Sequence, residues 1–177
     1  MSEKKPLFPG VKAGETFKVG NMEFIRFADT PAGTPVVLKD IAFRSRFGDN
    51  NDFRSSDILQ KLQAEFLPKI IEVVGDENVC EFETDLTTLD GLKFYGTMKS
   101  RISIPTFDFY RANVAVFDQY NPSAWWWLAT ADSVKPHYTP DWAVCVSPFG
   151  SICRDLCFYG YFGVRPFCIL KSSIFGS

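Results

Sequence analysis

Five cysteines and one histidine are the residues of this 177-residue chain best suited to catalysis or metal binding. Zinc sites prefer C-x₂-C pairs or nearby histidines. The closest cysteine pair here, Cys153 and Cys157, has three residues between its members, and His137 is the only histidine. Redox dithiols also use a shorter spacing than this pair. We therefore expect no metal site.

His137 is the one candidate for a general base. It stands between Pro136 and Tyr138, and no serine or cysteine is placed by spacing to act with it as a nucleophile. One alternative stays open, because Asp155 beside Cys153 and Cys157 could serve redox chemistry if a thiol there were acidic and reactive. We expect no catalytic residue, no cofactor and no enzymatic activity.

The C-terminal third differs from the rest of the chain in the residue types that it lacks. Residues 143–170 contain no Lys, Glu, Gln, Met or Trp, although Lys and Glu are among the commonest residues of globular proteins. Aromatic residues and arginine stand there instead, and these are typical of recognition surfaces. The predicted ligand-binding residues are His137, Tyr138, Asp141, Phe149, Arg154, Asp155, Phe158, Tyr159, Tyr161 and Phe162.

A buried strand pair is the alternative interpretation of the same region. It fits residues 143–146 and 167–170 well, because both are short apolar runs. It fits residues 153–162 poorly, because Arg154 and Asp155 interrupt the run and no clean alternation survives. We predict strands for the first two segments and an exposed surface for residues 149–162.

Charge and hydropathy limit the expected partners. The net charge of −2 provides no basic surface for nucleic acid. No apolar run reaches the roughly 18 residues of a membrane-spanning helix, and the first residues lack the apolar stretch of a signal peptide. We expect a protein that reaches a virion or cell surface by assembly, or else stays cytoplasmic. Its expected partner is an unknown protein or cell-surface ligand, with a homo-oligomer as a further option.

The N-terminal half contains clear local signals. Residues 1–15 resemble an arm, and residues 16–177 a single domain. The Gly-Asn pair at 20–21 predicts a β-hairpin between strands 16–19 and 22–27, and a third strand is expected at 36–43.

A helix is predicted next. Ser55 or Ser56 can cap its start, and Pro68 is expected to end it. Short strands are then expected at 70–74, 79–82, 92–95 and 102–104, with a hairpin turn at Asp90-Gly91 and a second short helix within 107–120. The predicted class is α+β, with short antiparallel or mixed strands, one or two helices and a loop-rich C-terminal region.

Two short motifs carry a resemblance to a known family. Trp125-Trp-Trp-Leu and Gly163-Val-Arg-Pro resemble the paired signature of a bacterial and phage family with a C-type-lectin-like fold. The N-terminal half is similar as well, with an opening hairpin and an Asn-x-x-x-Ser element before a helix ending in Phe-Leu, here Asn51 to Leu67. The resemblance covers about residues 15–171. Ala129-Thr130 stands where the family usually has Arg-Ser, so contacts of that arginine are not carried over.

The resemblance implies a C-type-lectin-like fold in which Trp125–Leu128 and Gly163–Pro166 form a scaffold and residues 137–162 form the binding face. More distantly, the family resembles the formylglycine-generating enzymes, which are oxidases that depend on a cysteine pair and copper. No matching arrangement occurs in this chain. The Glu-Pro-Asn, Gln-Pro-Asp and Trp-Asn-Asp motifs of calcium-dependent lectins do not occur either. The resemblance therefore implies neither copper chemistry nor calcium.

Some proteins of this fold are the variable targets of diversity-generating retroelements, which randomise adenines. Randomised AAC codons cannot encode Lys, Glu, Gln, Met or Trp, the five types missing from 143–170. Lys135 and Trp142 do not fit such codons and are interpreted as fixed framework positions. A chance gap in an aromatic strand region is the alternative explanation.

The sequence thus predicts a ligand- or receptor-binding protein with a hypervariable C-terminal surface. The alternatives are a structural or oligomerisation module of a virion or cell surface, and an oxidase related to the formylglycine-generating enzymes. Burial of most of Phe158, Tyr159, Tyr161 and Phe162 would contradict the prediction.

Overall fold

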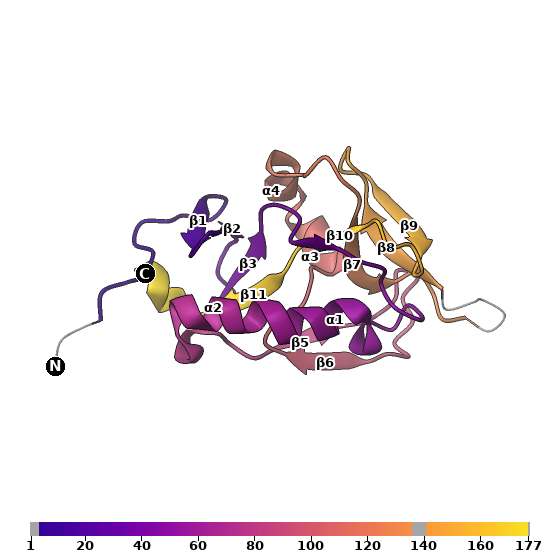
Figure 1. Cartoon of the computed structure of the whole chain (residues 1–177), viewed down its shortest axis with the longest axis horizontal. Helices are drawn as coiled ribbons and strands as arrows, with labels where there is room; N and C mark the ends of the chain where they lie inside the picture. The colour runs from indigo at the N-terminus through magenta and orange to yellow at the C-terminus, as the bar shows by residue number, and fades with distance from the viewer. Residues whose placement is uncertain (1–3, 136–140, 177) are drawn as a thin grey trace.

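The computed structural model describes residues 4–135 and 141–176 of the chain (Figure 1). Within these ranges, three β-sheets built from short strands pack with short helices. The predicted α+β class is confirmed.

The first sheet contains the N-terminal hairpin and the last strand of the chain. Its order is β1-β2-β3-β11, and all neighbouring strands are antiparallel. Gly20 has a φ of 63°, which a glycine adopts without strain, so the predicted hairpin turn is confirmed. The bounds of the strands are Thr16–Val19, Met22–Arg26, Thr34–Leu38 and Phe167–Leu170. The expected third strand at 36–43 is therefore shorter and begins two residues earlier.

The second sheet contains most of the C-terminal third. Its order is β4-β10-β7-β8-β9, and β10 runs parallel to β7 and antiparallel to β4. The bounds of the strands are Phe43–Arg44 (β4), Trp126–Ala131 (β7), Trp142–Val146 (β8), Ile152–Leu156 (β9) and Gly163–Val164 (β10). The strands predicted at 143–146 and 167–170 are confirmed.

The main helical segment begins where the sequence predicts and ends later. Ser56 accepts a hydrogen bond from the Leu59 N–H at 3.0 Å and caps helix α1. The segments that follow one another here are η1 (Phe53–Ser55), α1 (Asp57–Lys61), the π-helical η2 (Leu62–Phe66) and α2 (Leu67–Val74). The predicted end at Pro68 and the predicted strand at 70–74 are both wrong.

The π-helical turn before Pro68 explains this difference. The Leu67 N–H donates to the Leu62 carbonyl, five residues back. Pro68 lacks an N–H and its ring crowds the preceding turn of a regular α-helix. It lies in the first turn of α2, where a missing donor does little harm, and the wider π-turn leaves room for the ring.

The remaining elements lie outside the two larger sheets. They are η3 (Asp76–Asn78), β5 (Phe82–Asp85), β6 (Thr97–Ser100), α3 (Phe107–Ala112), α4 (Val114–Gln119) and η4 (Ser172–Phe175). The predicted second hairpin exists as the β5–β6 pair, but the strand expected at 92–95 is wrong because β6 begins only at Thr97. Residues 102–104 contribute one β-bridge, from Ser103 to Phe167. Two short helices replace the one expected within 107–120.

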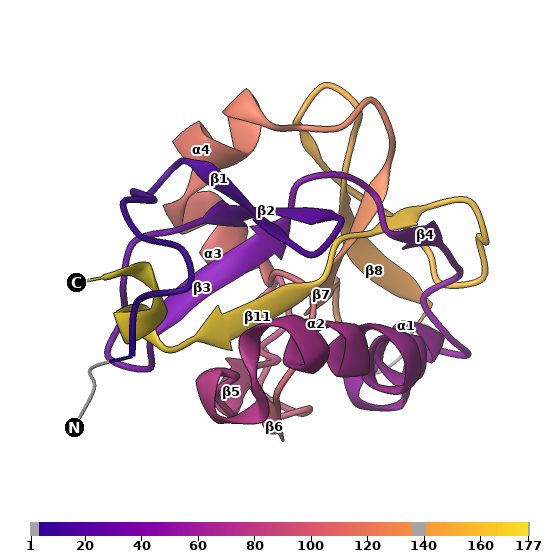
Figure 2. The same ribbon diagram turned by 60° about the vertical axis from the view of Figure 1, so that its left-hand side comes forward.

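Strand β7 at the centre of the five-stranded sheet is buried on both faces, with α1 on one side and α3 and α4 on the other (Figure 2), while α2 contacts β1 of the first sheet. Trp127 and Ala129 pack into the core cluster that contains the α1 residue Ile58. Trp126 and Leu128 pack into the cluster with Phe117 of α4. A strand that is buried on both faces reads as a continuous apolar run, which is the pattern of Trp-Trp-Leu.

The N-terminal residues 4–15 contain no helix or strand and pack against the first sheet. The Phe8 ring lies 4.8 Å from that of Phe17 and 5.9 Å from that of Phe175, measured between centroids. The Phe8 N–H also donates to the Ile174 carbonyl at 2.8 Å. In residues 4–135 and 141–176, the helices are too short or too polar to span a membrane.

Candidate ligand-binding surface

The two motifs that carry the family resemblance lie side by side in the second sheet. Gly163 is paired with Trp126 in parallel strands, and the Gly163 N–H donates to the Trp125 carbonyl at 2.7 Å. A Cβ atom at Gly163 would lie 2.3 Å from the Cδ1 atom of Ile41, which is far closer than van der Waals contact. This position therefore has no room for a side chain, and β10 can approach its neighbours closely.

The arginine of the second motif joins the two larger sheets. Arg165 is fully buried, and its guanidinium donates to the carbonyls of Leu38 at 3.0 Å and Lys39 at 2.9 Å. The guanidinium also lies 4.5 Å from the centre of a Trp126 ring. Burial lowers the pKa of Arg165 to about 10, so the side chain remains charged at neutral pH. Arg165 thus fixes the end of β3 relative to β7.

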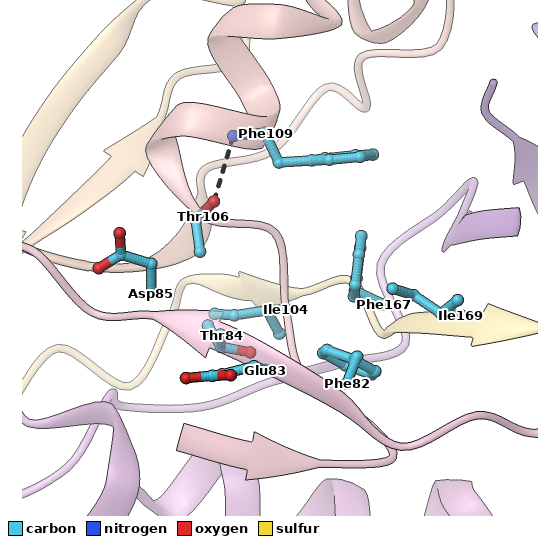
Figure 3. Close-up of a pocket in the computed structure, with 9 residues that line it drawn as sticks. All are labelled: Phe82, Glu83, Thr84, Asp85, Ile104, Thr106, Phe109, Phe167 and Ile169. Carbon is cyan, nitrogen blue, oxygen red and sulfur yellow. Dashed lines mark hydrogen bonds between the residues drawn. The ribbon is translucent and has the colours of Figure 1, made fainter. Parts of the chain in front are cut away.

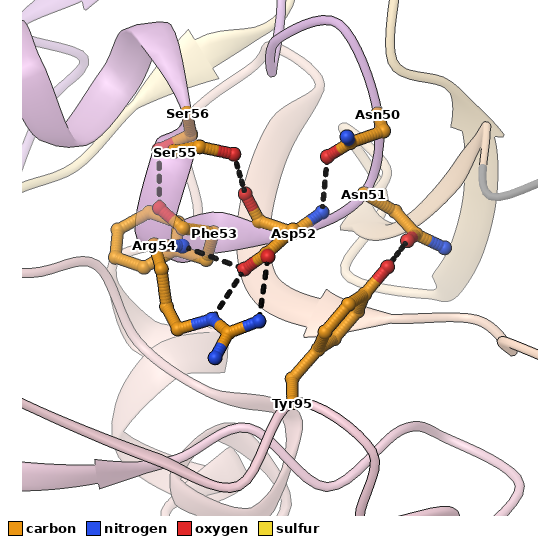
Figure 4. A network of polar contacts seen from close by, with 8 residues as sticks. All are labelled: Asn50, Asn51, Asp52, Phe53, Arg54, Ser55, Ser56 and Tyr95. Carbon is orange, nitrogen blue, oxygen red and sulfur yellow. Dashed lines mark hydrogen bonds and ion pairs between the residues drawn. The ribbon is translucent and has the colours of Figure 1, made fainter.

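Asn51 holds the two ends of the segment that contains residues 136–140. Its buried side-chain amide donates to the carbonyls of Ser133 and Trp142, both at 3.0 Å, and its oxygen accepts from the Tyr95 hydroxyl (Figure 4). The neighbouring Asp52 caps the following 3₁₀ turn. The Asn51 element noted in the sequence therefore ties together the end of β7 and the start of β8.

The segment from Cys157 to Phe162, here called the β9–β10 loop, is anchored at both ends. The Cys157 N–H donates to the Asp141 carbonyl at 2.7 Å, and the Cys157 carbonyl accepts from the Phe47 N–H at 2.9 Å. At the other end, the Phe162 carbonyl accepts from the Ser45 N–H at 3.0 Å. The two ends of the loop are thus fixed by neighbours that lie outside the loop.

Exposed aromatic side chains gather on this loop. Tyr161 is 77% exposed and Phe158 52% exposed, while Tyr159 and Trp125 are about half-exposed. We call these four residues the aromatic surface. Phe162 is only 8% exposed, because its ring is stacked 5.7 Å below that of Trp125 and lies 4.6 Å from that of Trp127. The prediction that Phe162 belongs to the binding face is wrong; it supports that face from below.

Arg154 and Asp155 lie on the edge strand β9, not in the loop. Neighbouring residues of a strand point to opposite faces, so these two side chains do not act together. Arg154 forms an ion pair of 2.7 Å with Asp132, beside a depression of about 370 Å³. The half-buried Asp155 accepts a hydrogen bond from the Leu156 N–H.

Phe149 is separated from the aromatic surface by the length of the β8–β9 hairpin. It is 96% exposed in the turn, where the Ser147 hydroxyl accepts from the Phe149 and Ser151 N–H groups. Asp141 lies at the opposite end of the hairpin, one five-residue strand or roughly 17 Å away. His137 and Tyr138 lie outside the described residues.

The structure thus brings together three predicted residues, Phe158, Tyr159 and Tyr161, and adds Trp125, which sequence reasoning placed in the scaffold. The alternation of side chains between the two faces of a strand could have indicated the position of Trp125. Trp125 and Trp127 point to one face, and Trp125 precedes the buried span of β7. Three of the four loop aromatics named in the prediction are exposed, so the condition that would contradict it is not met.

A disulfide between Cys145 and Cys153 joins β8 to the edge strand β9. Its presence was not expected from the cysteine spacing. Cys153 is therefore not available as a thiol partner of Cys157. Among the described residues, no three side chains of the metal-ligating types come together at one place.

The three free cysteines differ in their expected reactivity. Burial raises the pKa of both Cys157 and Cys168 from 9.0 to about 12. At pH 8 in the native protein, an aromatic disulfide reagent should modify the half-buried Cys80 and leave these two unmodified until unfolding. Absorbance of the released thiolate measures this, and Cys80→Ser should remove the native signal. A fast-reacting Cys157 would support the redox interpretation.

Comparison with protein-family models, with curated proteins and with solved structures finds no match for this chain.

Proposed function

We propose that this chain is a non-catalytic ligand-binding protein with a C-type-lectin-like fold and a hypervariable surface of the kind diversified by retroelements. The observation that carries the proposal is the aromatic surface on a loop whose backbone is fixed at both ends. Its partner would be a protein or cell-surface ligand, met on a virion or cell surface.

The arrangement of the loop suits binding. Trp and Tyr side chains offer large contact area at a low cost in conformational entropy, because they have few rotatable bonds. The main-chain hydrogen bonds of Cys157 and Phe162 hold both ends of the loop in place before a ligand arrives. Preorganisation of this kind raises affinity because little ordering remains to be done on binding.

The exposure pattern within residues 143–170 also supports variability. Buried positions such as Val144, Gly163 and Arg165 hold the sheets together. Phe158 and Tyr161 have largely exposed side chains, so their replacement removes few core contacts. Variable exposed residues and fixed buried residues can therefore coexist in one short segment, as in binding loops on a rigid scaffold.

The proposal predicts a specific DNA arrangement. The neighbouring DNA should contain a near-copy of the codons for residues 130–165 that differs only at adenines, beside a gene for a reverse transcriptase. The differing codons should include those of the exposed Phe158, Tyr159 and Tyr161 and exclude that of Gly163. Sequencing the flanking DNA tests this directly. Absence of such a copy would remove the retroelement part of the proposal.

A separate experiment tests whether the aromatic surface is free of contacts with other copies of the chain. Size-exclusion chromatography with light scattering should give either a monomer or an oligomer in which Tyr161 still reacts with a nitrating reagent, as judged by peptide mass analysis. An oligomer that protects Tyr161 would favour a structural module that packs on its own copies, and would contradict a binding role.

A further inference from the structure

The edge of strand β5 borders a cavity that the aromatic surface does not share. The cavity has a volume of about 170 Å³ and lies between β5, the start of α3 and β11 (Figure 3). The ring of Phe167 makes edge-to-face contacts with those of Phe82, at 5.2 Å, and Phe109, at 5.0 Å. Engineered apolar cavities of about 150 Å³ take up benzene. This one therefore has room for a single bulky apolar group.

The hydrogen-bond pattern of the β5–β6 pair directs backbone groups of β5 away from β6. The Leu86 N–H donates to the Gly96 carbonyl at 3.0 Å, so this pair is of the hydrogen-bonded kind. Such pairs alternate along an antiparallel ladder, which makes Thr84 bond toward β6 as well. The N–H and C=O groups of Glu83 and Asp85 therefore point to the opposite edge, where both residues line the cavity.

These groups have no backbone partner in another element of the described structure. After Cys80, whose N–H bonds to the Ile169 carbonyl at 2.9 Å, β5 diverges from β11 and leaves its own edge open. A second, independent observation points to an occupant. Thr84 on the cavity wall is buried, and its hydroxyl oxygen has no hydrogen-bond partner among the described residues. A buried polar atom left in this state costs about 1–3 kcal/mol.

The charges along this edge of β5 favour one kind of partner segment over another. Glu81, Glu83 and Asp85 alternate on the outer face of the chain here, and all three are exposed. Lys99 lies opposite Glu83 on the β6 side. On the open side, Arg111 of α3 lines a neighbouring pocket with Asp85, but it already forms an ion pair with Asp108. Opposite charges on adjacent strands are favourable and like charges are unfavourable. A β5 strand from a second copy would bring carboxylates together, so self-pairing is disfavoured.

We infer that the open edge of β5 binds an extended segment of a partner protein in which basic and bulky apolar residues alternate. The segment adds a strand beside β5, and its backbone pairs with Glu83 and Asp85. One apolar side chain enters the cavity between Phe82 and Phe109. Its basic side chains lie beside the carboxylates on the outer face.

A short synthetic peptide tests this inference on the full chain. The probe is the acetylated, amidated and fluorescently labelled pentapeptide Lys-Phe-Lys-Val-Lys, and fluorescence anisotropy measures its dissociation constant. An isomer with the composition regrouped as Lys-Lys-Lys-Phe-Val should bind at least about fivefold more weakly, because alternation places apolar side chains on one face. Equal binding of the two peptides would overturn the inference.

Two proline variants form a matched pair. Glu83→Pro removes an N–H that points to the open edge, and it should weaken binding at least about tenfold. Thr97→Pro removes the N–H of the residue opposite Asp85, which points to the outer edge of β6 and involves no charge, and should leave binding unchanged. Unaltered binding to Glu83→Pro would overturn the inference.

A charge reversal keeps the test decisive if the proline variant fails to fold. Glu83→Lys should weaken binding of the lysine peptide about threefold to tenfold, and strengthen binding of the matching peptide with glutamate in place of lysine. If Glu83→Lys bound both peptides with the affinities of the parent protein, the inference would be overturned. A dimer that Glu83→Lys dissociates, or uptake of benzene without any peptide binding, would also overturn it.

Discussion

Replacement of Arg165 by methionine should lower the free energy of unfolding by about 3 kcal/mol. The carbonyls of Leu38 and Lys39 lose their donor while staying buried, and each such loss costs about 1–3 kcal/mol. Relief of a buried charge offsets part of this cost. Urea unfolding monitored by circular dichroism measures the change.

The control is Arg111→Met, at an arginine whose side chain is 70% exposed, forms an ion pair with Asp108 and lies 5.3 Å from the centre of the Phe107 ring. It should change stability by less than about 0.5 kcal/mol. Arg165→Lys should fall between the two, since a lysine cannot reach both carbonyls with the planar geometry of a guanidinium. If Arg165→Met were as stable as the parent, the arginine would not be the link between the sheets.

Phe162→Ala should destabilise the protein by about 3–5 kcal/mol, which is the usual range for removing a buried phenylalanine. Its ring fills the space between Trp125 and Trp127. Loss of the ring also frees one face of Trp125, so tryptophan emission should shift to the red. Thermal and urea unfolding give the first quantity, and fluorescence gives the second.

Phe158→Ala is the matched change four positions earlier in the same loop. Because the Phe158 side chain is about half-exposed, its removal should alter stability by less than about 1 kcal/mol. The contrast between two phenylalanines of one loop is what separates a variable surface from its support. Equal destabilisation by both variants would mean that the loop is core, and would contradict the proposed binding surface.

Local turn and capping chemistry could be predicted from the sequence. The Gly20-Asn21 hairpin depends only on the backbone freedom of two residues, and Ser56 caps α1 through its own side chain. Residues 70–74 could not be assigned in this way. Their apolar and β-branched residues fit a strand, but Ile70 and Val74 lie four residues apart and turn one face to the core.

The candidate site was predictable in residue type but not in arrangement. Composition cannot distinguish Phe162 from Phe158, since the difference is which ring meets Trp127 once β10 is placed beside β7. Nearness in sequence also gave a wrong grouping of Phe149 with the loop aromatics, because Phe149 lies in the turn at the far end of the β8–β9 hairpin. The open edge of β5 depends on where that strand leaves β11, a long-range property that no local pattern encodes.

The π-helical turn at Leu62–Phe66 has a consequence for insertions and deletions. A π-turn contains one residue more than the regular turn that it replaces, and each residue of an α-helix turns the following ones by about 100°. Deleting one residue there would restore a regular α-helix that still turns Ile70 and Val74 toward the core, but Pro68 would then crowd the preceding turn. The extra residue of the π-turn and Pro68 therefore depend on each other, and a one-residue deletion should be tolerated better when Pro68 is replaced as well.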